Sequence, residues 1–541
     1  LKDTILNKLQ SNPVAQQMLQ FGNNIGNLFP NEEALCMASA FMQDKQTRIV
    51  VKKNRYEAQQ LYQRLKPLIN DTLLFVMEES LRVQAIASSP EDKQEQLYVL
   101  TQFVKEDKPR IIICNTAAFL RYLPDKELFK SLCFKFEVDQ EITIAELKQK
   151  LNRAGYTKVN YVDRPCTYAS RGGIVDVYCL EYEHPIRIEF FDTVIESIRL
   201  FHEETQRTIQ TIDSVLINPA TDLLFTDDQI EYLQKEIDSE LEKQQAKLIQ
   251  DDYDFLLDYI EKDKISIENY DIDPHLYIYF SYLNANKLTD YVNGHIIFSS
   301  QEEVESGYKK LNEETISFIQ EMVESHQYLP KYGMFHDIFT FEKEHTIQMF
   351  HDFLDFKHPI FSKIETLEKS DQPLIQILEN LKGENIYISL DEEHTKKVQE
   401  ALKAYSIHRN ITFIEDDFYE GFTYEDISVY TQQELFHHPS QIKRYQKTFK
   451  QGQILQNILE LEPNDYVVHE QYGIGQYVGI TTRKIKGKTL DYLHVLYNGG
   501  DELFVPLSQF QLVRKYVSKE GVGIKLSQLG SNKWKKTKEK V

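Results

Sequence analysis

The chain has 541 residues, of which 41% are hydrophobic, so it is long enough for about three or four domains and is not disordered as a whole. Its formal net charge of -22 excludes a non-specific nucleic-acid coat, because phosphate contacts require clustered Lys and Arg. The balance reverses at the C-terminus, where residues 514–541 carry nine basic residues against Glu520 and Glu539.

The five cysteines form no C-x-x-C pair, which indicates a reduced protein without a zinc site. No apolar run approaches the ~18–20 residues of a membrane span, and no signal-peptide pattern opens the chain. The first residue is Leu1, which indicates a trimmed N-terminus. We therefore expect a soluble cytoplasmic protein without membrane contact.

Residues 1–125 alternate between strand and helix patterns. Short apolar runs at Ile49–Val51 and Ile111–Cys114 predict buried strands, and Tyr56–Ile69 between them has helical periodicity. This alternation is typical of an α/β domain with a parallel sheet and crossover helices.

Residues 126–212 have a different pattern. Apolar runs at Ile174–Tyr178 and Ile186–Phe191 predict hairpin strands within a compact α+β insertion. Further along, Thr226 and Gln229 have the spacing of a capping box. The capping box predicts the start of a helix whose apolar face consists of Ile230, Leu233, Ile237 and Leu241.

Strand and helix patterns alternate again from residue 386. They predict a second small α/β unit, formed by Ile386–Leu390, Thr395–Ala404, Ile411–Ile414 and Ile427–Tyr430. The segment Pro439–Ile458 is polar and has no strand pattern, so we interpret it as a linker.

The C-terminal part contains two apolar runs within residues 466–480, separated by a turn with Gly473 and Gly475. Two more strand patterns, Leu490–Tyr497 and Leu503–Leu507, flank an Asn-Gly-Gly hairpin signal. Together these runs predict a small, strongly curved SH3/Tudor-like β-barrel.

Residues 487–489 (Gly-Lys-Thr) match the end of a phosphate-binding loop, G-x-x-x-x-G-K-[ST]. The glycine required upstream is Thr482, however, and the segment lies between two predicted strands rather than before a helix. We therefore predict that this segment binds no nucleotide.

A second candidate loop starts at Gly26, before a predicted helix. Asn31, Glu32 and Glu33 replace its Gly-Lys-Thr end, and glutamate repels phosphate. We interpret these four residues as a degenerate nucleotide loop. The histidine pairs His437/His438 and His345/His351 have no Cys or acidic partner at metal-ligand spacing, so we predict neither a metal site nor a catalytic site.

Strand alternation places Arg187, Glu189 and Phe191 on one face of the strand at 186–191, opposite its apolar residues. Arg and aromatic residues are enriched at interface hot spots, and Arg binds carboxylates in bidentate fashion. Alternatively, Arg187 pairs with Glu189 on a solvated sheet while Phe191 packs against a neighbour. Spacing alone favours this second interpretation.

The insertion contains two motifs, Y-A-S-R-G-G-I-V-D at residues 168–176 and R-I-E-F-F-D at residues 187–192. They resemble domain 2 of the bacterial transcription-repair coupling factors (Mfd) and of the excision-repair protein UvrB. The resemblance implies that this domain binds the damage sensor UvrA through Arg171, Arg187 and Phe191.

Residues 466–480 resemble the polymerase-interacting module of the same factors, which is shared with the CarD regulators. The resemblance implies that an edge strand at Val478–Ile485 docks on the RNA polymerase β subunit by strand addition. The residues expected at this contact are Ile480, Thr481, Thr482, Arg483, Lys484 and Ile485. Relatives can carry an apolar residue in place of Arg483, so its role departs from the family pattern.

The resemblance covers the whole chain and implies a domain plan. The plan consists of a UvrB-like domain 1a with a degenerate P-loop (1–125), a UvrA-binding domain 2 (126–212), domain 1b (213–340), a small α/β domain 3 (341–438), a linker (439–459), a CarD-like polymerase-interacting barrel (460–518) and the start of a helix leading to a translocase (519–541).

This plan implies a protein that couples transcription to nucleotide excision repair by binding stalled RNA polymerase and recruiting UvrA. In the family, the full-length factor displaces the polymerase by ATP-driven translocation on DNA. ATP, Mg²⁺ and most DNA contacts belong to its motor domains. We therefore expect this chain to be the N-terminal half of such a factor, without a cofactor of its own.

Two other classes compete with this interpretation. A UvrB-type damage-loading helicase would need an intact Walker A loop, which Asn31, Glu32 and Glu33 replace. A stand-alone CarD-like transcription regulator would carry its barrel near the N-terminus rather than after residue 460.

Overall fold

The computed structural model describes most of the chain. Outside the description lie residues 1, 21–24, 27, 79–89, 204, 271–272, 352–360, 368–371, 408, 416–417, 437–465, 470–472, 486–487, 499–500, 507–512 and 516–541. The chain divides into two compact units, Leu1–Ile442 and Lys443–Val541. Within the described ranges, no helix is both long and apolar enough to cross a bilayer.

The first unit contains a parallel six-stranded sheet with the order β1-β14-β13-β2-β4-β3. Its strands are β1 (Ile25–Gly26), β2 (Arg48–Lys52), β3 (Thr72–Phe75), β4 (Ile111–Asn115), β13 (His295–Phe298) and β14 (Ile347–His351). Ile49 and Val51 of β2 belong to one apolar core, and Val50 belongs to another. Both faces of the sheet are therefore covered, as parallel strands require, and the predicted strands and parallel sheet are confirmed.

The first helices of this unit are α1 (Lys2–Lys8), η1 (Leu9–Ser11), α2 (Pro13–Gln17), α3 (Pro30–Asp44), α4 (Arg55–Leu65), α6 (Pro90–Lys105), α7 (Thr116–Leu120) and α8 (Lys126–Ser131). The helix expected at Tyr56–Ile69 is α4, which ends at Leu65. Pro67 has no backbone N–H and disfavours helical geometry in the residue before it, so the helix stops ahead of the expected end.

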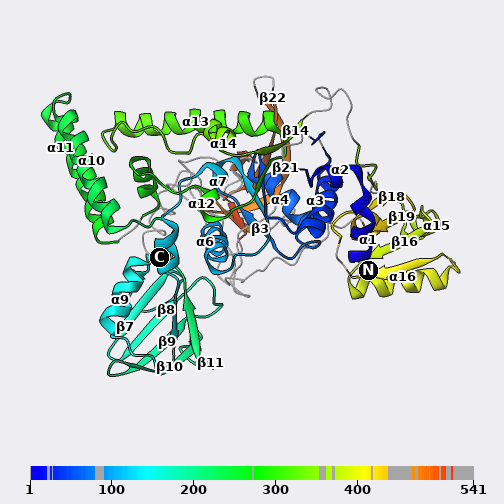
Figure 1. Cartoon of the computed structure of the whole chain (residues 1–541), viewed down its shortest axis with the longest axis horizontal. Helices are drawn as coiled ribbons and strands as arrows, with labels where there is room; N and C mark the ends of the chain where they lie inside the picture. Colours follow the sequence, from blue (N-terminus) through cyan, green and yellow to red (C-terminus); the bar gives the residue numbers. More distant parts are fainter. Residues whose placement is uncertain are drawn as a thin grey trace. The chain divides into compact units, whose positions relative to one another are not determined.

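The insertion is a second six-stranded sheet with the order β11-β10-β9-β8-β7-β6, antiparallel except between β6 and β7. Its strands are β6 (Thr157–Lys158), β7 (Thr167–Arg171), β8 (Ile174–Tyr178), β9 (Ile186–Phe191), β10 (Val194–Phe201) and β11 (Thr208–Ile212). The expected hairpin strands are confirmed. Helix α9 (Ile144–Arg153) lies beside this sheet in Figure 1, and its Leu147 and Leu151 share an apolar cluster with Val175 and Ile188.

A tight turn joins β7 to β8. Gly172 has a φ of 57°, and a Cβ on Gly173 would lie only 3.0 Å from the carbonyl oxygen of Phe190. Glycine at both positions therefore allows the turn, which pairs Arg171 with Ile174.

A separate two-stranded antiparallel sheet is formed by β5 (Phe134–Glu137) and β12 (Ser214–Ile217).

Helices α10 (Asp227–Gln245) and α11 (Gln250–Glu268) form a hairpin that projects from the unit (Figure 1). The predicted capping box is confirmed, because the Gln229 N–H donates to Thr226 Oγ1 at 3.1 Å and the Thr226 N–H donates to Gln229 Oε1 at 3.0 Å. The expected apolar face is wholly or partly buried at Ile230, Leu233, Ile237 and Leu241. The helices that follow are η2 (Pro274–Tyr282), α12 (Leu288–Tyr291), α13 (Gln301–Glu324) and α14 (Ile338–Glu344).

The third sheet has the order β15-β18-β19-β16-β17, which confirms the second α/β unit. Its elements are β15 (Glu365–Thr366), α15 (Leu374–Glu379), β16 (Asn385–Ser389), α16 (Glu392–Ala404), β17 (Ile411–Ile414), β18 (Phe422–Tyr424), β19 (Ile427–Tyr430) and α17 (Gln432–Phe436). Helix α16 begins before the expected Thr395, because the Asp391 side chain accepts a hydrogen bond from the His394 N–H and so caps the helix one turn earlier.

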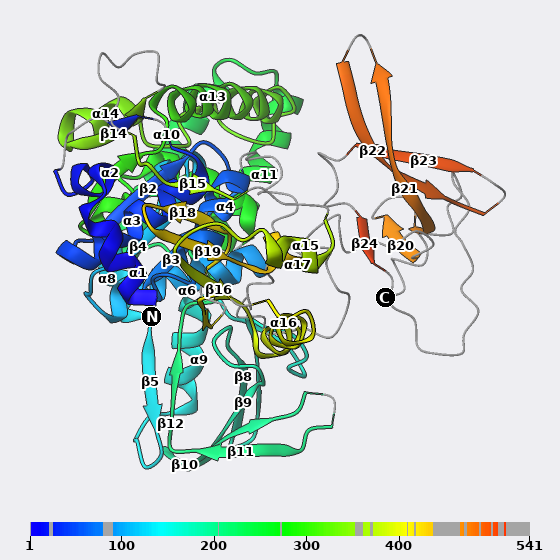
Figure 2. The same ribbon diagram turned by 90° about the vertical axis from the view of Figure 1, so that its right-hand side faces the viewer.

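The second unit contains an antiparallel five-stranded sheet with the order β23-β22-β21-β20-β24. The strands are β20 (Tyr466–His469), β21 (Gly473–Ile485), β22 (Lys488–Leu496), β23 (Glu502–Pro506) and β24 (Val513–Lys515). Figure 2 shows β21 and β22 as a long two-stranded ribbon. The strands predicted at Leu490–Tyr497 and Leu503–Leu507 are confirmed as β22 and β23, which pair as a hairpin. The turn expected at Gly473 and Gly475 is wrong, because both glycines lie within β21 and pair with His469 and Val467 of β20. Glycine at 475 instead leaves room for the side chain of Val495. The expected linker at 439–458 and the segment 519–541 lie outside the described residues.

Candidate protein-interaction surfaces

The degenerate nucleotide loop lies between β1 and α3. Gly26 ends β1, and Asn31, Glu32 and Glu33 lie in the first turn of α3. Glu32 caps this turn, because its carboxylate accepts a hydrogen bond from the Phe29 N–H at 2.8 Å. The residues that replace a phosphate-binding end therefore stabilise the start of the helix.

Glu33 is buried among polar partners. Its carboxylate accepts hydrogen bonds from Lys52 Nζ at 2.5 Å and from Ser299 Oγ at 2.6 Å. Lys52 ends β2 and Ser299 follows β13, so both lie at carboxyl ends of parallel strands, where open α/β sheets bind ligands. This edge of the sheet instead holds the carboxylate of Glu33. Its occupation supports the prediction that the loop binds no nucleotide.

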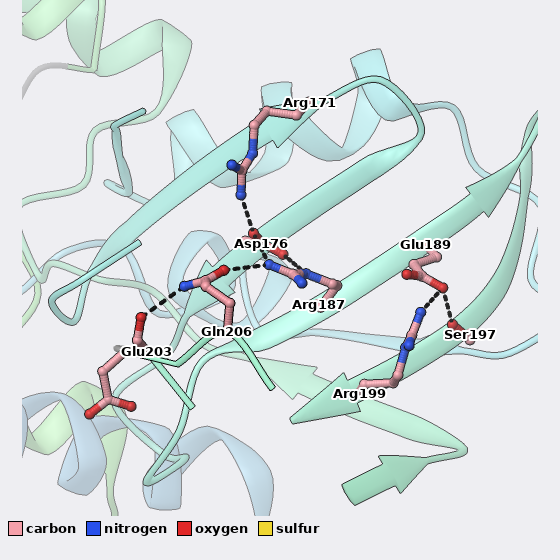
Figure 3. A network of polar contacts seen from close by, with 8 residues as sticks. All are labelled: Arg171, Asp176, Arg187, Glu189, Ser197, Arg199, Glu203 and Gln206. Atoms are coloured by element: carbon pink, nitrogen blue, oxygen red, sulfur yellow. Dashed lines mark hydrogen bonds and ion pairs between the residues drawn. The ribbon is translucent and has the colours of Figure 1, made fainter. Parts of the chain in front are cut away.

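The insertion presents a polar face on which two arginines meet one carboxylate (Figure 3). Arg187 donates from Nε and Nη2 to the two oxygens of Asp176, at 2.7 and 2.9 Å. Its Nη2 also donates to Gln206 Oε1 at 2.8 Å, and its guanidinium lies 4.3 Å from the ring centre of Phe201. Hydrogen bonding to Asp176 raises the pKa of Arg187 above its usual value. The guanidinium of Arg187 is therefore fixed by a carboxylate, an amide oxygen and an aromatic ring.

Arg171 reaches the same carboxylate less tightly. Its Nη2 donates to Asp176 Oδ2 at 3.2 Å, and its guanidinium lies 4.7 Å from the ring centre of Tyr161. The side chain of Arg171 is 45% exposed, whereas that of Asp176 is only 2% exposed. A buried carboxylate thus anchors one half-exposed arginine and one enclosed arginine.

The pairing expected from spacing differs from the pairing observed. Arg187 binds Asp176 on β8, whereas Glu189 pairs with Arg199 and accepts a hydrogen bond from Ser197 Oγ at 2.9 Å (Figure 3). Burial opposes ionisation of Glu189, but the hydrogen bonds from Ser197 and Arg199 prevail and lower its pKa. The interpretation of an Arg187–Glu189 pair is therefore wrong, because partners are set by register across strands rather than by spacing along one strand.

Phe191 lies at the end of β9 and is 75% exposed. The expectation that it packs against a neighbour is therefore wrong. The predicted alternation of the strand is confirmed, since Ile186, Ile188 and Phe190 are buried. An exposed aromatic side chain on the same sheet as half-exposed Arg171 has the composition of an interface hot spot.

The sequence interpretation assigned no role to Asp176, Gln206 or Tyr161. A signal for Asp176 was present, because a lone carboxylate in the apolar strand Ile174–Tyr178 requires a cationic partner when buried. Tyr161 and Gln206 lie in loops, and their neighbours depend on how those loops fold.

The strand expected to contact RNA polymerase is the second half of β21. This strand pairs with β20 only over Gly473–Gln476 and with β22 over Gln476–Ile485. Within the described part of the chain, the segment after Gln476 therefore has a strand neighbour on one side only. Val478 is 38% exposed, and Thr481 is half-buried. The side chains of the other expected contact residues lie outside the description: Ile480, Thr482, Arg483, Lys484 and Ile485.

Two family models match the chain. A model described as the UvrB interaction domain matches residues 134–223, which contain Arg171, Arg187 and Phe191. A model described as the CarD-like/TRCF RID domain matches residues 461–517, which contain the open segment of β21. The chain is thus a multidomain α/β protein that combines a UvrB-type interaction domain with a CarD-like domain.

The relatives of the chain agree with this combination. It is 30% identical to the transcription-repair-coupling factor of Bacillus subtilis (strain 168), over 91% of this chain and 45% of the relative. The proteins of the same name from Staphylococcus haemolyticus and Staphylococcus epidermidis are 28% and 27% identical, each over 95% of this chain and 47% of the relative. The resemblance to transcription-repair coupling factors is confirmed, and the chain spans about half the length of these curated relatives.

We expect the chain neither to bind ATP tightly nor to hydrolyse it. Glu32 and Glu33 stand where a phosphate loop needs Lys and a hydroxyl residue, and they present negative charge to a phosphate. Titration calorimetry with Mg-ATP and a phosphate-release assay measure binding and turnover. Turnover that is abolished by mutating residues 26–33 would contradict this expectation.

We expect Glu33→Ala to destabilise the first unit by about 3 kcal/mol, because it leaves the buried ammonium of Lys52 without its carboxylate. Urea unfolding, followed by circular dichroism, measures the change. The matched control is Glu231→Ala, which removes the carboxylate of a solvent-exposed pair with Lys235 and is expected to change little. Equal effects of the two substitutions would refute a structural role for Glu33.

Proposed function

We propose that this protein couples transcription to nucleotide excision repair by binding RNA polymerase with its C-terminal unit and UvrA with its insertion. One observation carries the proposal: a UvrB-type interaction domain and a CarD-like/TRCF RID domain occur in one chain, at 134–223 and 461–517. The similarity to transcription-repair-coupling factors over more than nine-tenths of the chain supports the same role.

The polar face of the insertion is the proposed UvrA site, with Arg171, Arg187 and Phe191 as its residues. Interfaces gain most of their affinity from a few aromatic and arginine side chains in fixed positions. The bidentate hold of Asp176 on Arg187 supplies the fixed position, and Phe191 supplies exposed apolar area. These features support a rigid protein-binding surface.

The second half of β21 is the proposed polymerase site. We propose that it belongs to an SH3/Tudor-like barrel and adds a strand of the polymerase β subunit to its open side. Strand addition obtains affinity from backbone hydrogen bonds and specificity from alternate side chains. Those side chains are Ile480, Thr482 and Lys484 on one face, and Thr481, Arg483 and Ile485 on the other.

The whole protein is proposed to be a cytoplasmic, ATP-dependent DNA translocase that displaces the stalled polymerase. ATP, Mg²⁺ and most DNA contacts would belong to motor domains outside the sequence described, since the chain spans about half the length of its relatives. The domain plan from 1–125 to 519–541 belongs to the same proposal. A pull-down of the 541-residue chain with UvrA and, separately, with the polymerase β subunit tests both arms, and failure to capture either protein would reject the proposal.

We expect Phe191→Ala to weaken UvrA binding about tenfold, because it removes an exposed aromatic anchor. The thermal midpoint should stay unchanged, since the ring is 75% exposed. Phe255→Ala on α11, where the ring is 52% exposed, is the control and should bind as the wild type does.

Arg187→Ala should lower both the affinity for UvrA and the thermal midpoint, because the Asp176 carboxylate loses its bidentate partner.

For the polymerase arm, successive N–H groups of a strand point to opposite edges, so Thr481→Pro and Thr482→Pro remove donors on different sides of β21. The variant that loses the donor facing away from β22 should abolish binding to the β subunit with the fold intact. The variant that loses the donor facing β22 should disturb the pairing of the two strands. Because Arg483 and Lys484 are cationic, we also propose that the β-subunit edge is acidic, so Arg483→Glu should weaken binding at low salt. Unchanged binding in all three folded variants would place the contact elsewhere on this unit.

A further inference from the structure

The two arginines that share Asp176 differ in how much of each remains available to a partner. Arg187 makes three hydrogen bonds, lies over the ring of Phe201, and its side chain is 18% exposed. Arg171 makes one hydrogen bond of 3.2 Å among the described residues, and its side chain is 45% exposed. A guanidinium has five N–H donors in a planar fork, so Arg171 keeps most of its donors for another carboxylate.

Tyr161 presents an aromatic ring beside that fork. Its ring centre lies 4.7 Å from the Arg171 guanidinium carbon, and the residue is 65% exposed. The loop that carries it is anchored, because the neighbouring Val162 is buried in a small cluster with Ala169 and Tyr178. Tyr161 is therefore an exposed ring on a fixed loop, stacked against an arginine that it orients.

Phe191 belongs to the same end of the sheet. Ile174 pairs with Arg171 on one side and with Glu189 on the other, and Phe191 is two residues beyond Glu189. The register therefore places Phe191 near the β7–β8 turn, at the end of the sheet where Figure 3 shows Arg171. This end of the sheet therefore carries Tyr161 against the Arg171 guanidinium and, two strands away on β9, the exposed ring of Phe191.

We propose that Tyr161 and Arg171 form the direct contact of this face with a carboxylate on its partner, and that Arg187 is a positioning residue. Arg187 fixes the carboxylate of Asp176, which in turn holds Arg171 at the angle that stacking on Tyr161 requires. The partner carboxylate binds the free edge of the Arg171 fork, and apolar groups beside it cover Tyr161 and Phe191. The inference rests on the proposed function, since it takes UvrA as the partner.

Conservative substitutions separate the two roles, measured as the Kd of UvrA for the full 541-residue chain by titration calorimetry. Arg171→Lys keeps the charge but loses the planar fork and the stacking, so it should weaken binding about tenfold. Arg187→Lys keeps a cation beside Asp176, so it should stay within about threefold of the wild type. Arg171→Gln, which removes the charge, should also flatten the dependence of Kd on ionic strength, whereas Arg187→Lys should not.

Tyrosine variants test the second half of the contact. Tyr161→Ala should weaken binding about tenfold, and Tyr161→Phe, which keeps the ring, should bind as the wild type does. The control is Tyr232→Ala, which removes a tyrosine that is 49% exposed on α10 and should leave the Kd unchanged. Thermal midpoints equal to that of the wild type establish that each variant is folded.

The outcomes distinguish the inference from the function beneath it. A wild-type chain that does not bind UvrA refutes the proposed function. If the wild type binds and Phe191→Ala weakens it, but Tyr161→Ala matches Tyr232→Ala, the function stands and the assignment of Tyr161 is wrong. A larger loss for Arg187→Lys than for Arg171→Lys would reverse the two roles and overturn the inference.

Discussion

A single buried carboxylate, Asp176, determines the arrangement of the polar face on the insertion. Its side chain is 2% exposed within an apolar strand, and an uncompensated charge at that depth would be strongly unfavourable. Two guanidinium groups from different strands solve this problem, and in doing so they tie β7, β8 and β9 to one register. The same contacts leave Arg171 only partly engaged. The requirement to compensate Asp176 thus produces a surface with fixed geometry and remaining hydrogen-bonding capacity.

Glu33 is a second buried carboxylate, and its partners among the described residues leave no arginine partly free for another protein. Glu33 meets Lys52 and Ser299 at the carboxyl edge of the parallel sheet, and there the charge is matched by one cation and one hydroxyl inside the fold. The α/β architecture supports nucleotide binding in other proteins, but here the side chain of Glu33 occupies the edge of the sheet where such ligands bind. Fold and site are therefore separable: the first sheet holds the fold together, and the proposed interaction surfaces lie on the insertion and on β21.

The sequence was sufficient for features that depend on nearby residues. Apolar periodicity predicted β2, β4, β8 and β9, and the Thr226 and Gln229 spacing predicted the start of α10, because these signals act over a few residues. The sequence could not predict which residues contact each other across strands. The partner of Arg187 is Asp176 rather than Glu189 because β8 and β9 pair in one register, which strand spacing does not contain. Tyr161 reaches Arg171 only because Val162 anchors its loop in a cluster that forms on folding.

The two proposed surfaces rely on different physics, and this difference has a consequence for how sequences can change. An open strand such as the second half of β21 offers backbone groups, which every residue except proline supplies, so its side chains can vary while docking is kept. That tolerance accommodates the arginine at position 483. The polar face depends instead on a few side chains whose geometry is fixed by Asp176, and there even an Arg-to-Lys exchange alters the donor pattern. The two arms of the proposed coupling role are therefore constrained separately: backbone exposure limits change in β21, and charge compensation limits change in the insertion.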